Sequence, residues 1–353
     1  MKIIQVIPDL NFGGAEIMCE NLTRALIDEG HNVLVVSLYT KDTTIASRMQ
    51  RDHIKVIFLE KTKGVDFSIV FKLRKIFKQE QPDVIHTHRH VTPYTFLAAY
   101  GMNIKMVHTI HSIASKENNK IGIILNKLFF KKRIIPVALS ELVQETIIEV
   151  YAIPKSKVPV IYNGIPLEKC MLKNDYNIKG TAKILHIGRY TMAKNHFKMI
   201  EALVEVHKQY PNIQVTFLGD GELKKDVKNY IGKFNASSFI NMAGTTDSVY
   251  PYLRDTDIFI LPSIYEGMPM TLIEAMGTAC PIIASNVGGI PNMIDNSSGV
   301  LIKPDVIGIK SAILDLLTNK LKRETIAKNA LKKSESFSSK NMAKEYIRLY
   351  NVL

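Results

Sequence analysis

The chain alternates short runs of Val, Ile and Leu with longer amphipathic segments, and this alternation is the feature that most restricts its fold. Continuous apolar strands that alternate with helices build parallel sheets covered on both faces. The sequence therefore predicts an α/β protein with two Rossmann-like, doubly wound domains. The expected strands form two sets, 2–7, 33–37, 56–59, 84–86, 106–110, 136–139 and 158–162, followed by 184–187, 215–218, 240–243, 258–261, 282–285 and 300–302.

Between the two sets, residues 166–182 have no apolar periodicity and are predicted to be a linker. At 353 residues the chain is long enough for two domains of ordinary size. We expect an N-terminal domain over 1–165 and a C-terminal domain over 183–335. Because sheets of this kind bind ligands at the carboxyl ends of their strands, we expect the domains to face each other across a cleft that holds the site.

Composition indicates a soluble globular protein, with 46% hydrophobic and 22% charged residues. No apolar run approaches the roughly 20 residues that a membrane-spanning helix needs, and the stretch from Met1 to Pro8 is too short for a secretion signal. The three cysteines are an odd number without paired spacing, which excludes a disulfide framework and fits a reducing compartment. We therefore expect a cytoplasmic protein.

The formal charge of +13 is concentrated in the first half of the chain. Residues 51–133 contain 16 Lys and Arg against 6 Asp and Glu, an excess of +10 that leaves +3 for the rest. Within this range the apolar segment 121–125 precedes the basic segment 127–133, a mixture typical of segments that lie on anionic lipid. We expect residues 51–133 to bind an anionic membrane surface, with a solvated basic face as the alternative. Nucleic acid is not an expected partner, because no nucleic-acid motif accompanies the charge.

Two carboxylates, Glu266 and Glu274, lie eight residues apart on either side of a Gly-Met-Pro break. The break follows a predicted strand and precedes apolar residues at helical spacing, so it should begin a helix, with the proline in its first turn. The amides of Met268, Met270 and Thr271 should then be free to bind an anion. Because carboxylates only accept hydrogen bonds, the two glutamates suit hydroxyl pairs of a sugar ring or a ribose. The alternative is that Glu266 only interacts favourably with the helix dipole and that Glu274 is a solvated glutamate of the helix.

Two further strand ends carry residues suited to phosphate. Gly13 and Gly14 follow the first strand, where glycines let a backbone approach a ligand closely. They do not form the G-x-G-x-x-G pattern, so no nicotinamide cofactor is implied, and a tight turn is the alternative. Arg189 and Lys194 follow the strand 184–187. The guanidinium of Arg189 and the ammonium of Lys194 could together bind a diphosphate. The alternative is that both are ordinary surface charges.

These motifs occur together in a pattern that resembles the retaining glycosyltransferases of family 4, which have the GT-B fold. The resemblance runs from residue 3 to the end of the chain, and the segment 336–353 resembles the family's last helix, which returns to the N-terminal domain. The motifs that carry it are Gly13-Gly14-Ala-Glu16, Tyr162-Asn163-Gly164-Ile165, Arg189, Lys194, Gly219-Asp-Gly221, Glu266 with Glu274, and Gly288-Gly289-Ile-Pro291.

The resemblance implies a role for each matching residue. His111 matches the histidine near the reacting centre, and Glu266 the carboxylate that grips the donor sugar. Glu274 matches the residue that holds the ribose hydroxyls. The diphosphate of the donor would be bound by Arg189, Lys194, Gly13 and Gly14, and the donor sugar by Glu266, Gly267, Met268, Pro269, Met270 and Thr271.

The resemblance further implies a hexosyltransferase that moves a sugar from a nucleotide diphosphate sugar, above all a UDP-sugar, to a lipid-linked or polysaccharide precursor. It implies retention of anomeric configuration, no cofactor and no metal ion, and we expect the protein to be peripheral on the inner face of the cell membrane. Two alternatives are a nucleotide-sugar epimerase of related architecture and a non-catalytic accessory subunit. Arg189, Lys194 and Glu266 are all present, which argues against the accessory subunit.

His86, His88 and His90 alternate where a predicted strand ends. Alternate residues of a strand share a face, so the three imidazoles could converge on zinc. No carboxylate or cysteine stands within this run. We expect the histidines to form a polar wall of the cleft instead.

Overall fold

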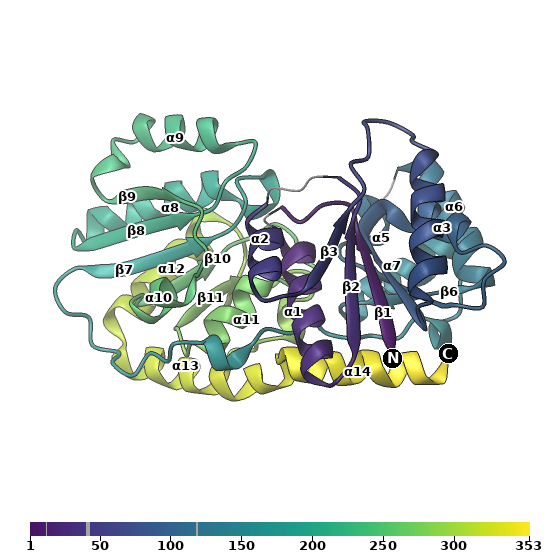
Figure 1. The fold of residues 1–353 in the computed structure, drawn as a ribbon. Helices are drawn as coiled ribbons and strands as arrows, with labels where there is room; N and C mark the ends of the chain where they lie inside the picture. Colours follow the sequence, from purple (N-terminus) through teal and green to yellow (C-terminus); the bar gives the residue numbers. More distant parts are fainter. Residues whose placement is uncertain (12, 40–42, 118) are drawn as a thin grey trace. The chain divides into compact units, whose positions relative to one another are not determined.

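The computed structural model describes residues 1–11, 13–39, 43–117 and 119–353, which form two compact units (Figure 1). Unit 1 comprises Met1–Ile165 and Ser338–Leu353, and unit 2 comprises Pro166–Phe337. Each unit contains a six-stranded parallel sheet flanked by helices. The predicted α/β class with two doubly wound sheets is therefore confirmed.

The sheet of unit 1 has the strand order β3-β2-β1-β4-β5-β6, so the order reverses between β1 and β4. Alternate residues of β1 enter opposite cores, since Ile4 and Val6 pack with one cluster while Ile3 packs with another. Burial on both faces explains the continuous apolar runs. The strands are β1 (Lys2–Ile7), β2 (Asn32–Ser37), β3 (Lys55–Phe58), β4 (Val84–His88), β5 (Lys105–Ile110) and β6 (Ile134–Ala138). The helices are α1 (Gly14–Asp28), α2 (Thr44–Arg51), α3 (Ser68–Glu80), α4 (Thr92–Ala98), α5 (Ala114–Glu117), α6 (Lys120–Lys132), α7 (Glu141–Tyr151) and α14 (Ser339–Val352).

The strand predicted over 158–162 is wrong. Only a single bridge joins Ala138 to Val160 there. The amide of Ala138 donates to the carbonyl of Pro159 at 3.0 Å, and the amide of Ile161 donates back to Ala138 at 2.9 Å. Pro159 has no N–H, so the segment does not continue a ladder along β6.

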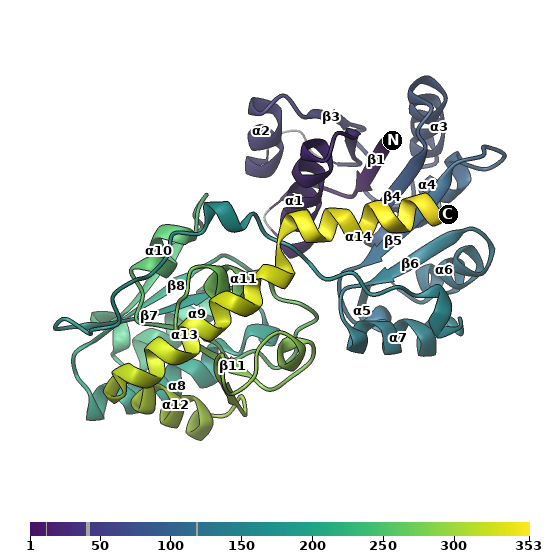
Figure 2. The same ribbon diagram turned by 90° about the horizontal axis from the view of Figure 1, so that it is seen from below.

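The last helix, α14, packs on α1 within unit 1, and Figure 2 shows the two helices side by side. Its buried side chains Met342, Tyr346 and Tyr350 share a core with Met18 and Leu22 of α1. They cover the face of the sheet to which Ile3 also belongs. A segment far away in sequence thus completes one of the two cores of unit 1.

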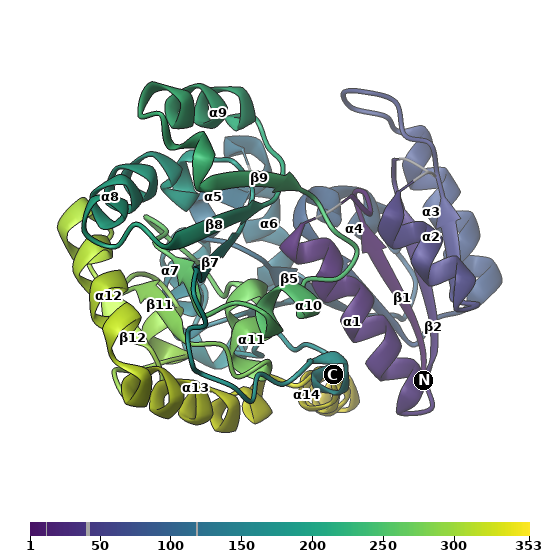
Figure 3. The same ribbon diagram turned by 90° about the vertical axis from the view of Figure 1, so that its left-hand side faces the viewer.

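The sheet of unit 2 has the order β12-β11-β10-β7-β8-β9 and reverses between β7 and β10. Helix α8 contacts α12, and α11 contacts α13 (Figure 3). The strands are β7 (Ala182–Ile187), β8 (Ile213–Leu218), β9 (Ile240–Gly244), β10 (Ile258–Leu261), β11 (Ile282–Ser285) and β12 (Val300–Ile302). The helices are α8 (His196–Gln209), α9 (Lys224–Lys233), α10 (Tyr250–Arg254), α11 (Met270–Gly277), α12 (Val306–Thr318) and α13 (Lys320–Ser334).

Residues 166–182, predicted to be a linker, pack on the rest of unit 2 through hydrogen bonds. The amide of Lys173 donates to Thr278 at 2.9 Å, and the Tyr176 hydroxyl donates to the carbonyl of Ala279 at 3.1 Å. The guanidinium of Arg323 donates to the carbonyl of Tyr176 at 2.8 Å. These contacts explain why the segment clusters with unit 2.

Gly164 lies where the two parts of unit 1 meet, and we expect an alanine there to destabilise the protein. A Cβ at this position would be 2.5 Å from the carbonyl oxygen of Ser338 and 2.7 Å from Cα of Ser339, both backbone atoms. Overpacking of this kind costs about 1–3 kcal/mol. Gly164→Ala should therefore lower the midpoint of thermal unfolding. Gly232→Ala in α9 is the matched control, because nothing lies within 4 Å of its added Cβ, and equal midpoints for the two variants would contradict this packing.

Candidate functional site

Except for Gly13 and Gly14 of unit 1, the residues predicted to bind the donor lie at the carboxyl ends of neighbouring strands of unit 2, in the loops after these strands or in helix α11. β7 continues through residues 188–195 into α8, and β10 continues through 262–269 into α11. β7 and β10 are adjacent, and the strand order reverses between them. Open α/β sheets bind their ligands at such a reversal.

Lys194 and Glu266 come from these two loops and form an ion pair. The distance from Nζ to Oε1 is 2.5 Å, and the side chains are only 18% and 12% exposed. Ser263 donates its hydroxyl proton to the same oxygen at 2.7 Å. Burial strengthens such a pair and makes the loss of one partner costly. Oε2 of Glu266 has no hydrogen-bond partner among the described residues.

Glycines let the loops around this pair approach one another at backbone distance. Gly288, at φ +59°, lies so close to Glu266 that an added Cβ would be 1.9 Å from its carbonyl oxygen. That oxygen accepts the amide proton of Gly289 at 3.1 Å. Gly219, at φ +149°, packs on the carbonyl oxygen of Gly188, with an added Cβ 2.0 Å away. The Gly219 and Gly288 motifs of the sequence therefore support the loops that carry Lys194 and Glu266.

Helix α11 begins at Met270, with Pro269 in an extended conformation at its N-cap. The prediction that Pro269 lies in the first turn is thus wrong by one position. The amides of Met270 and Thr271 have no acceptor within the helix, while the side chains of Met268 and Met270 are buried. The Thr271 hydroxyl is buried and has no hydrogen-bond partner among the described residues.

Glu274 lies in helix α11, after Glu266, and Arg189 lies on the loop after β7, before Lys194. Glu274 is buried in α11, and together with burial, which has the larger effect, its carboxylate raises the pKa of the Cys170 thiol to about 12. Arg189 is exposed on the loop after β7. The structure thus brings Lys194, Ser263 and Glu266 into direct contact. The sequence motifs did not include Ser263, although a polar residue two positions after a buried strand is a signal for it.

His111 lies at the carboxyl end of β5 in unit 1 and is partly exposed. Its Nε2 is 3.0 Å from Nδ1 of His88, and its backbone amide donates to Oε1 of Glu117 at 3.2 Å. Burial, then the neighbouring imidazoles, keeps the pKa of His111 well below its usual value, so the ring is neutral at pH 7. Burial raises the pKa of Glu117 to about 8, so this carboxyl is mostly protonated there.

Gly13 is the N-cap of α1, which begins at Gly14. An added Cβ at Gly13 would be 2.3 Å from Oε2 of Glu16. Glu16 also accepts a hydrogen bond from Nη1 of Arg89 at 2.6 Å, and Arg89 holds a left-handed backbone at φ +58° directly after β4. A carboxylate of the chain itself therefore lies at the start of α1. A role of Gly13 and Gly14 toward a diphosphate stays a prediction.

The predicted polar wall of histidines is wrong, because His86 and His88 are fully buried. His86 bonds the Tyr350 hydroxyl of α14 and the Thr109 hydroxyl, both at 2.7 Å. His90 lies beyond the end of β4 and is exposed. Within the part of the chain that the structure describes, no three His, Cys, Asp or Glu residues are grouped so that they could hold a metal ion.

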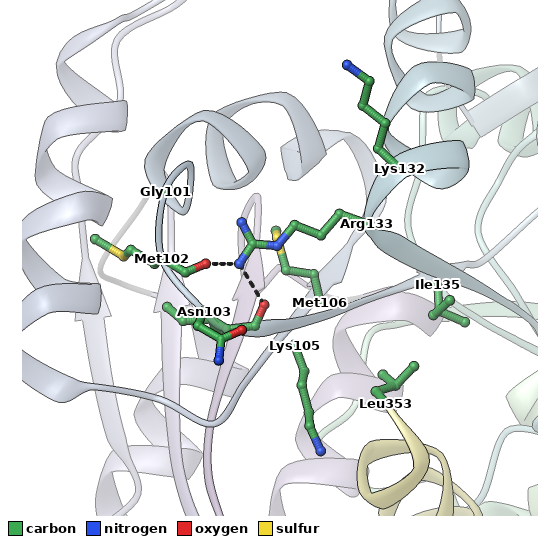
Figure 4. A pocket seen from close by; sticks show the side chains of 10 residues that line it. Gly101, Met102, Asn103, Lys105, Met106, Lys132, Arg133, Ile135 and Leu353 are labelled. Atoms are coloured by element: carbon green, nitrogen blue, oxygen red, sulfur yellow. Dashed lines mark hydrogen bonds between the residues drawn. The ribbon is translucent and has the colours of Figure 1, made fainter.

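A cavity of about 520 Å³ lies in unit 1 near the amino ends of β5 and β6, away from the strand ends that carry His111. The guanidinium of Arg133 points across it to the backbone carbonyl of Met102 (Figure 4). It also donates to the carbonyl of Ile104 at 3.0 Å. Arg133 therefore holds the connection before β5, and the cavity is not part of the candidate site.

Comparison with known families identifies the class of protein. The family described as "Glycosyl transferases group 1" matches residues 171–333, and "Glycosyltransferase Family 4" matches residues 12–169. The chain belongs to the family-4 glycosyltransferases. This glycosyltransferase is an enzyme of the hexosyltransferase type, as the names of curated relatives also support.

Two curated relatives illustrate the similarity. The glycosyltransferase is 29% identical over 261 residues to "UDP-Gal:alpha-D-GlcNAc-diphosphoundecaprenol alpha-1,3-galactosyltransferase" of Escherichia coli, covering 67% of each chain. It is 26% identical over 300 residues to the capsular polysaccharide biosynthesis glycosyltransferase CapH of Staphylococcus aureus, covering 81% of this chain and 82% of the relative.

Solved structures support the fold of this glycosyltransferase. HepE of Anabaena, in complex with UDP and glucose, aligns with a TM-score of 0.88 at 18% identity over 100% of both chains. Sucrose-phosphate synthase of Thermosynechococcus elongatus aligns with a TM-score of 0.83 at 20% identity, over 99% of this chain and 98% of the other. The predicted GT-B fold is confirmed.

Gly288→Ala should impair catalysis because its Cβ would push away the backbone of Glu266. Displacing a binding group by about 1 Å can cost roughly 100-fold in rate, and we expect a loss of that order in kcat/KM for the sugar nucleotide. Gly244→Ala is the matched control. Gly244 also has a positive φ, +75°, but nothing lies within 4 Å of its added Cβ. Nucleotide release would be measured for both variants, and equal rates would contradict the role of this close approach.

Proposed function

We propose that this protein transfers a hexose from a UDP-sugar to a hydroxyl of a lipid-linked or polysaccharide precursor, with retention of anomeric configuration and without a metal ion. The observation that carries the proposal is the contact of Lys194, Ser263 and Glu266 at the carboxyl ends of β7 and β10. This contact places a fixed cation beside a carboxylate that can accept hydrogen bonds from hydroxyls, at the point where the strand order reverses.

Lys194 and Arg189 would bind the diphosphate of the donor. The leaving diphosphate gains negative charge as its bond to the sugar breaks, so preorganised cations stabilise the transition state more than the bound donor. Lys194 is held in place by Glu266, whereas Arg189 is exposed and can close on the ligand as a bidentate fork. These two cations supply the countercharge that a metal ion would otherwise provide.

Glu266 and the start of α11 would hold the donor sugar. Oε1 of Glu266 is taken by Lys194 and Ser263, which leaves Oε2 for sugar hydroxyls. The amides of Gly267, Met270 and Thr271 and the buried Thr271 hydroxyl add donors beside it. Glu274 would bind the ribose hydroxyls from within α11.

The chemistry needs no nucleophile from the protein. The bond between the anomeric carbon and the phosphate oxygen breaks, the acceptor oxygen bonds to the same carbon on the same face, and the leaving phosphate takes the acceptor's proton. Glu266 is paired with an ammonium and a hydroxyl, so it suits positioning better than attack on the sugar. The arrangement therefore relies on orientation and countercharge rather than on a covalent intermediate.

The names of similar proteins support the donor and the acceptor class. The E. coli relative is named for UDP-Gal and a diphosphoundecaprenol-linked saccharide, and the S. aureus relative for capsular polysaccharide biosynthesis. HepE was solved with UDP and glucose. On this basis we propose a UDP-hexose and a lipid-linked or growing saccharide.

Lys194→Ala and Glu266→Gln should each lower kcat by about 100- to 1,000-fold, the usual loss for one preorganised electrostatic contact. Lys198→Ala is the matched control, because this lysine lies four residues further on, in α8, and among the described residues its ammonium pairs only with the carboxylate of Glu201. The assay supplies a panel of UDP-hexoses with membrane extract as acceptor, in the presence of EDTA. Nuclear magnetic resonance of the product gives its anomeric configuration. Inverted product, an epimerised donor, or near-normal rates in Lys194→Ala would count against the proposal.

We further propose that unit 1 binds an anionic membrane through its helices α3, α4 and α6. On α6, Ile121, Ile124 and Leu128 are exposed at spacings of three and four, so they lie on one side of the helix; Ile121 is 69% exposed. Lys127 and Lys131 belong to the same helix. Apolar side chains flanked by lysines are typical of helices that lie in a lipid interface.

Helix α3 repeats this combination. Phe67 at its start and Phe71, which is 73% exposed, precede the exposed Lys75 and Lys78 on the same side of the helix. α3 contacts α4, which contacts α6 in turn (Figure 2), and α4 ends near the exposed Tyr100. The range 51–133 with its excess of +10 contains all three helices, and all of it except residue 118 is described.

A peripheral contact is the form of membrane association proposed. No helix in the described part of the chain is long and apolar enough to span a bilayer. Each exposed apolar side chain that enters the interface contributes roughly 1.5 kcal/mol, and each lysine near anionic headgroups about 1 kcal/mol. Together they hold the protein on the inner face of the membrane, where a lipid-linked acceptor would be found.

Phe71→Ser and Ile124→Ser should each weaken binding to vesicles of mixed phosphatidylglycerol and phosphatidylcholine by about tenfold. Ile307→Ser in unit 2 is the matched control, since Ile307 is 77% exposed but lies on α12. Cosedimentation measures the bound fraction, and 0.5 M salt should reduce it for the unmodified protein. Binding that is unaffected by both unit 1 substitutions, or equal on uncharged vesicles, would contradict this surface.

A further inference from the structure

We propose that His88, held by Gln5, fixes His111 in a single tautomer, with the ring proton on Nε2 and the lone pair of Nδ1 presented as a hydrogen-bond acceptor. The inference deepens the proposed function and rests on it, and it takes from the family resemblance the place of His111 near the reacting centre. It assigns His88 and Gln5 as positioning residues for that imidazole. One chain of hydrogen bonds inside unit 1 connects these residues, from α1 to the end of β5.

The chain begins on α1, where the direction of each bond is fixed. The Thr23 hydroxyl donates its only proton to the carbonyl of Cys19 at 2.8 Å. Nε2 of Gln5 lies 2.6 Å from Oγ1 of Thr23 and 3.4 Å from the same carbonyl oxygen. Both neighbours are acceptors toward Gln5, so the amide nitrogen must face them and the amide oxygen must face away.

The amide oxygen of Gln5 therefore determines the tautomer of His88. Nε2 of His88 is 2.8 Å from Oε1 of Gln5, and it must carry a proton to make that bond. His88 is fully buried, and burial lowers its pKa to about 3, so the ring is neutral. A neutral ring protonated on Nε2 has an unprotonated Nδ1. That nitrogen accepts the proton of Nε2 of His111 at 3.0 Å.

His111 is left with one assigned proton and one free lone pair. Its ring is neutral at pH 7, because burial and the neighbouring imidazoles and Arg89 disfavour the cation. Nδ1 makes no hydrogen bond with any described residue, and the ring is partly exposed. His111 thus offers an acceptor to a substrate hydroxyl, from the donor sugar or from the acceptor, but no second donor.

Packing around His88 holds the ring in this orientation. The His86 ring lies 4.3 Å from it, centroid to centroid, and is itself bonded to Tyr350 and Thr109. His88 therefore has little freedom to rotate. Without His88, the His111 ring would exchange between tautomers and rotamers, and a smaller fraction would present Nδ1 correctly.

Long-range proton–nitrogen correlation spectra of the full-length protein with ring-labelled histidine test the proposal. We expect the His111 signals, identified by their loss in His111→Gln, to show a protonated Nε2 and an unprotonated Nδ1 at pH 7. His88→Phe keeps an aromatic ring but removes the acceptor, so it should give a mixture of tautomers and lower kcat about 10- to 100-fold, with little change in donor KM. His88→Asn can place an oxygen near the former Nδ1 and should restore the tautomer in part.

His108→Phe is the matched control, because His108 is equally buried in β5 but bonds Thr87 and Thr92 instead. Gln5→Met is a second variant should His88→Phe fail to fold, and it should also give a mixture at His111. A wild-type His111 protonated on Nδ1, or an unchanged tautomer in His88→Phe or Gln5→Met, would overturn the inference. The expected tautomer in a protein that transfers no sugar would uphold the inference and refute the proposed function.

Discussion

The ion pair between Lys194 and Glu266 is the interaction on which the candidate site depends. It joins the loop after β7 to the loop after β10, and these strands lie side by side where the strand order reverses. Each charge is mostly buried, so each is stable there only because the other is present. The pair keeps an ammonium and a carboxylate at the carboxyl edge of the sheet in an orientation that a diphosphate sugar can use without a large rearrangement.

Unit 1 also has a salt bridge at its reversal of strand order. β1 and β4 are adjacent at its reversal of strand order, and Glu16 after β1 pairs with Arg89 after β4. In both units a salt bridge joins the two segments that follow the strands at the reversal of strand order. The two units differ in the groups that lie beside the salt bridge. Unit 2 has a free helix start and an exposed arginine, whereas unit 1 has a neutral histidine on a buried hydrogen-bond chain. These differences suit unit 2 to binding the donor and unit 1 to accepting a hydrogen bond from a substrate hydroxyl.

Most of the fold could be predicted from local patterns, since the strands that formed end within two residues of their predicted limits. The exception, 158–162, shows that apolar character alone does not make a strand where Pro159 lacks a donor. Glu266, Glu274, Arg189 and Lys194 could be named from their positions in the sequence, and His111 from the family resemblance, but their contacts could not be predicted. Lys194 is 72 residues from Glu266, and His86 is buried by Tyr350, 264 residues away. Such contacts depend on strand order and on the return of α14, which no local pattern records.

The most direct test of the account is calorimetric titration of UDP and of UMP into the unmodified protein and into Lys194→Ala. If Lys194 binds the second phosphate, the unmodified protein should bind UDP more tightly than UMP, and this preference should largely disappear in the variant. An equal preference for UDP in both proteins, or no binding of UDP to the unmodified protein, would contradict the central claim that the pair of Lys194 and Glu266 marks the donor site.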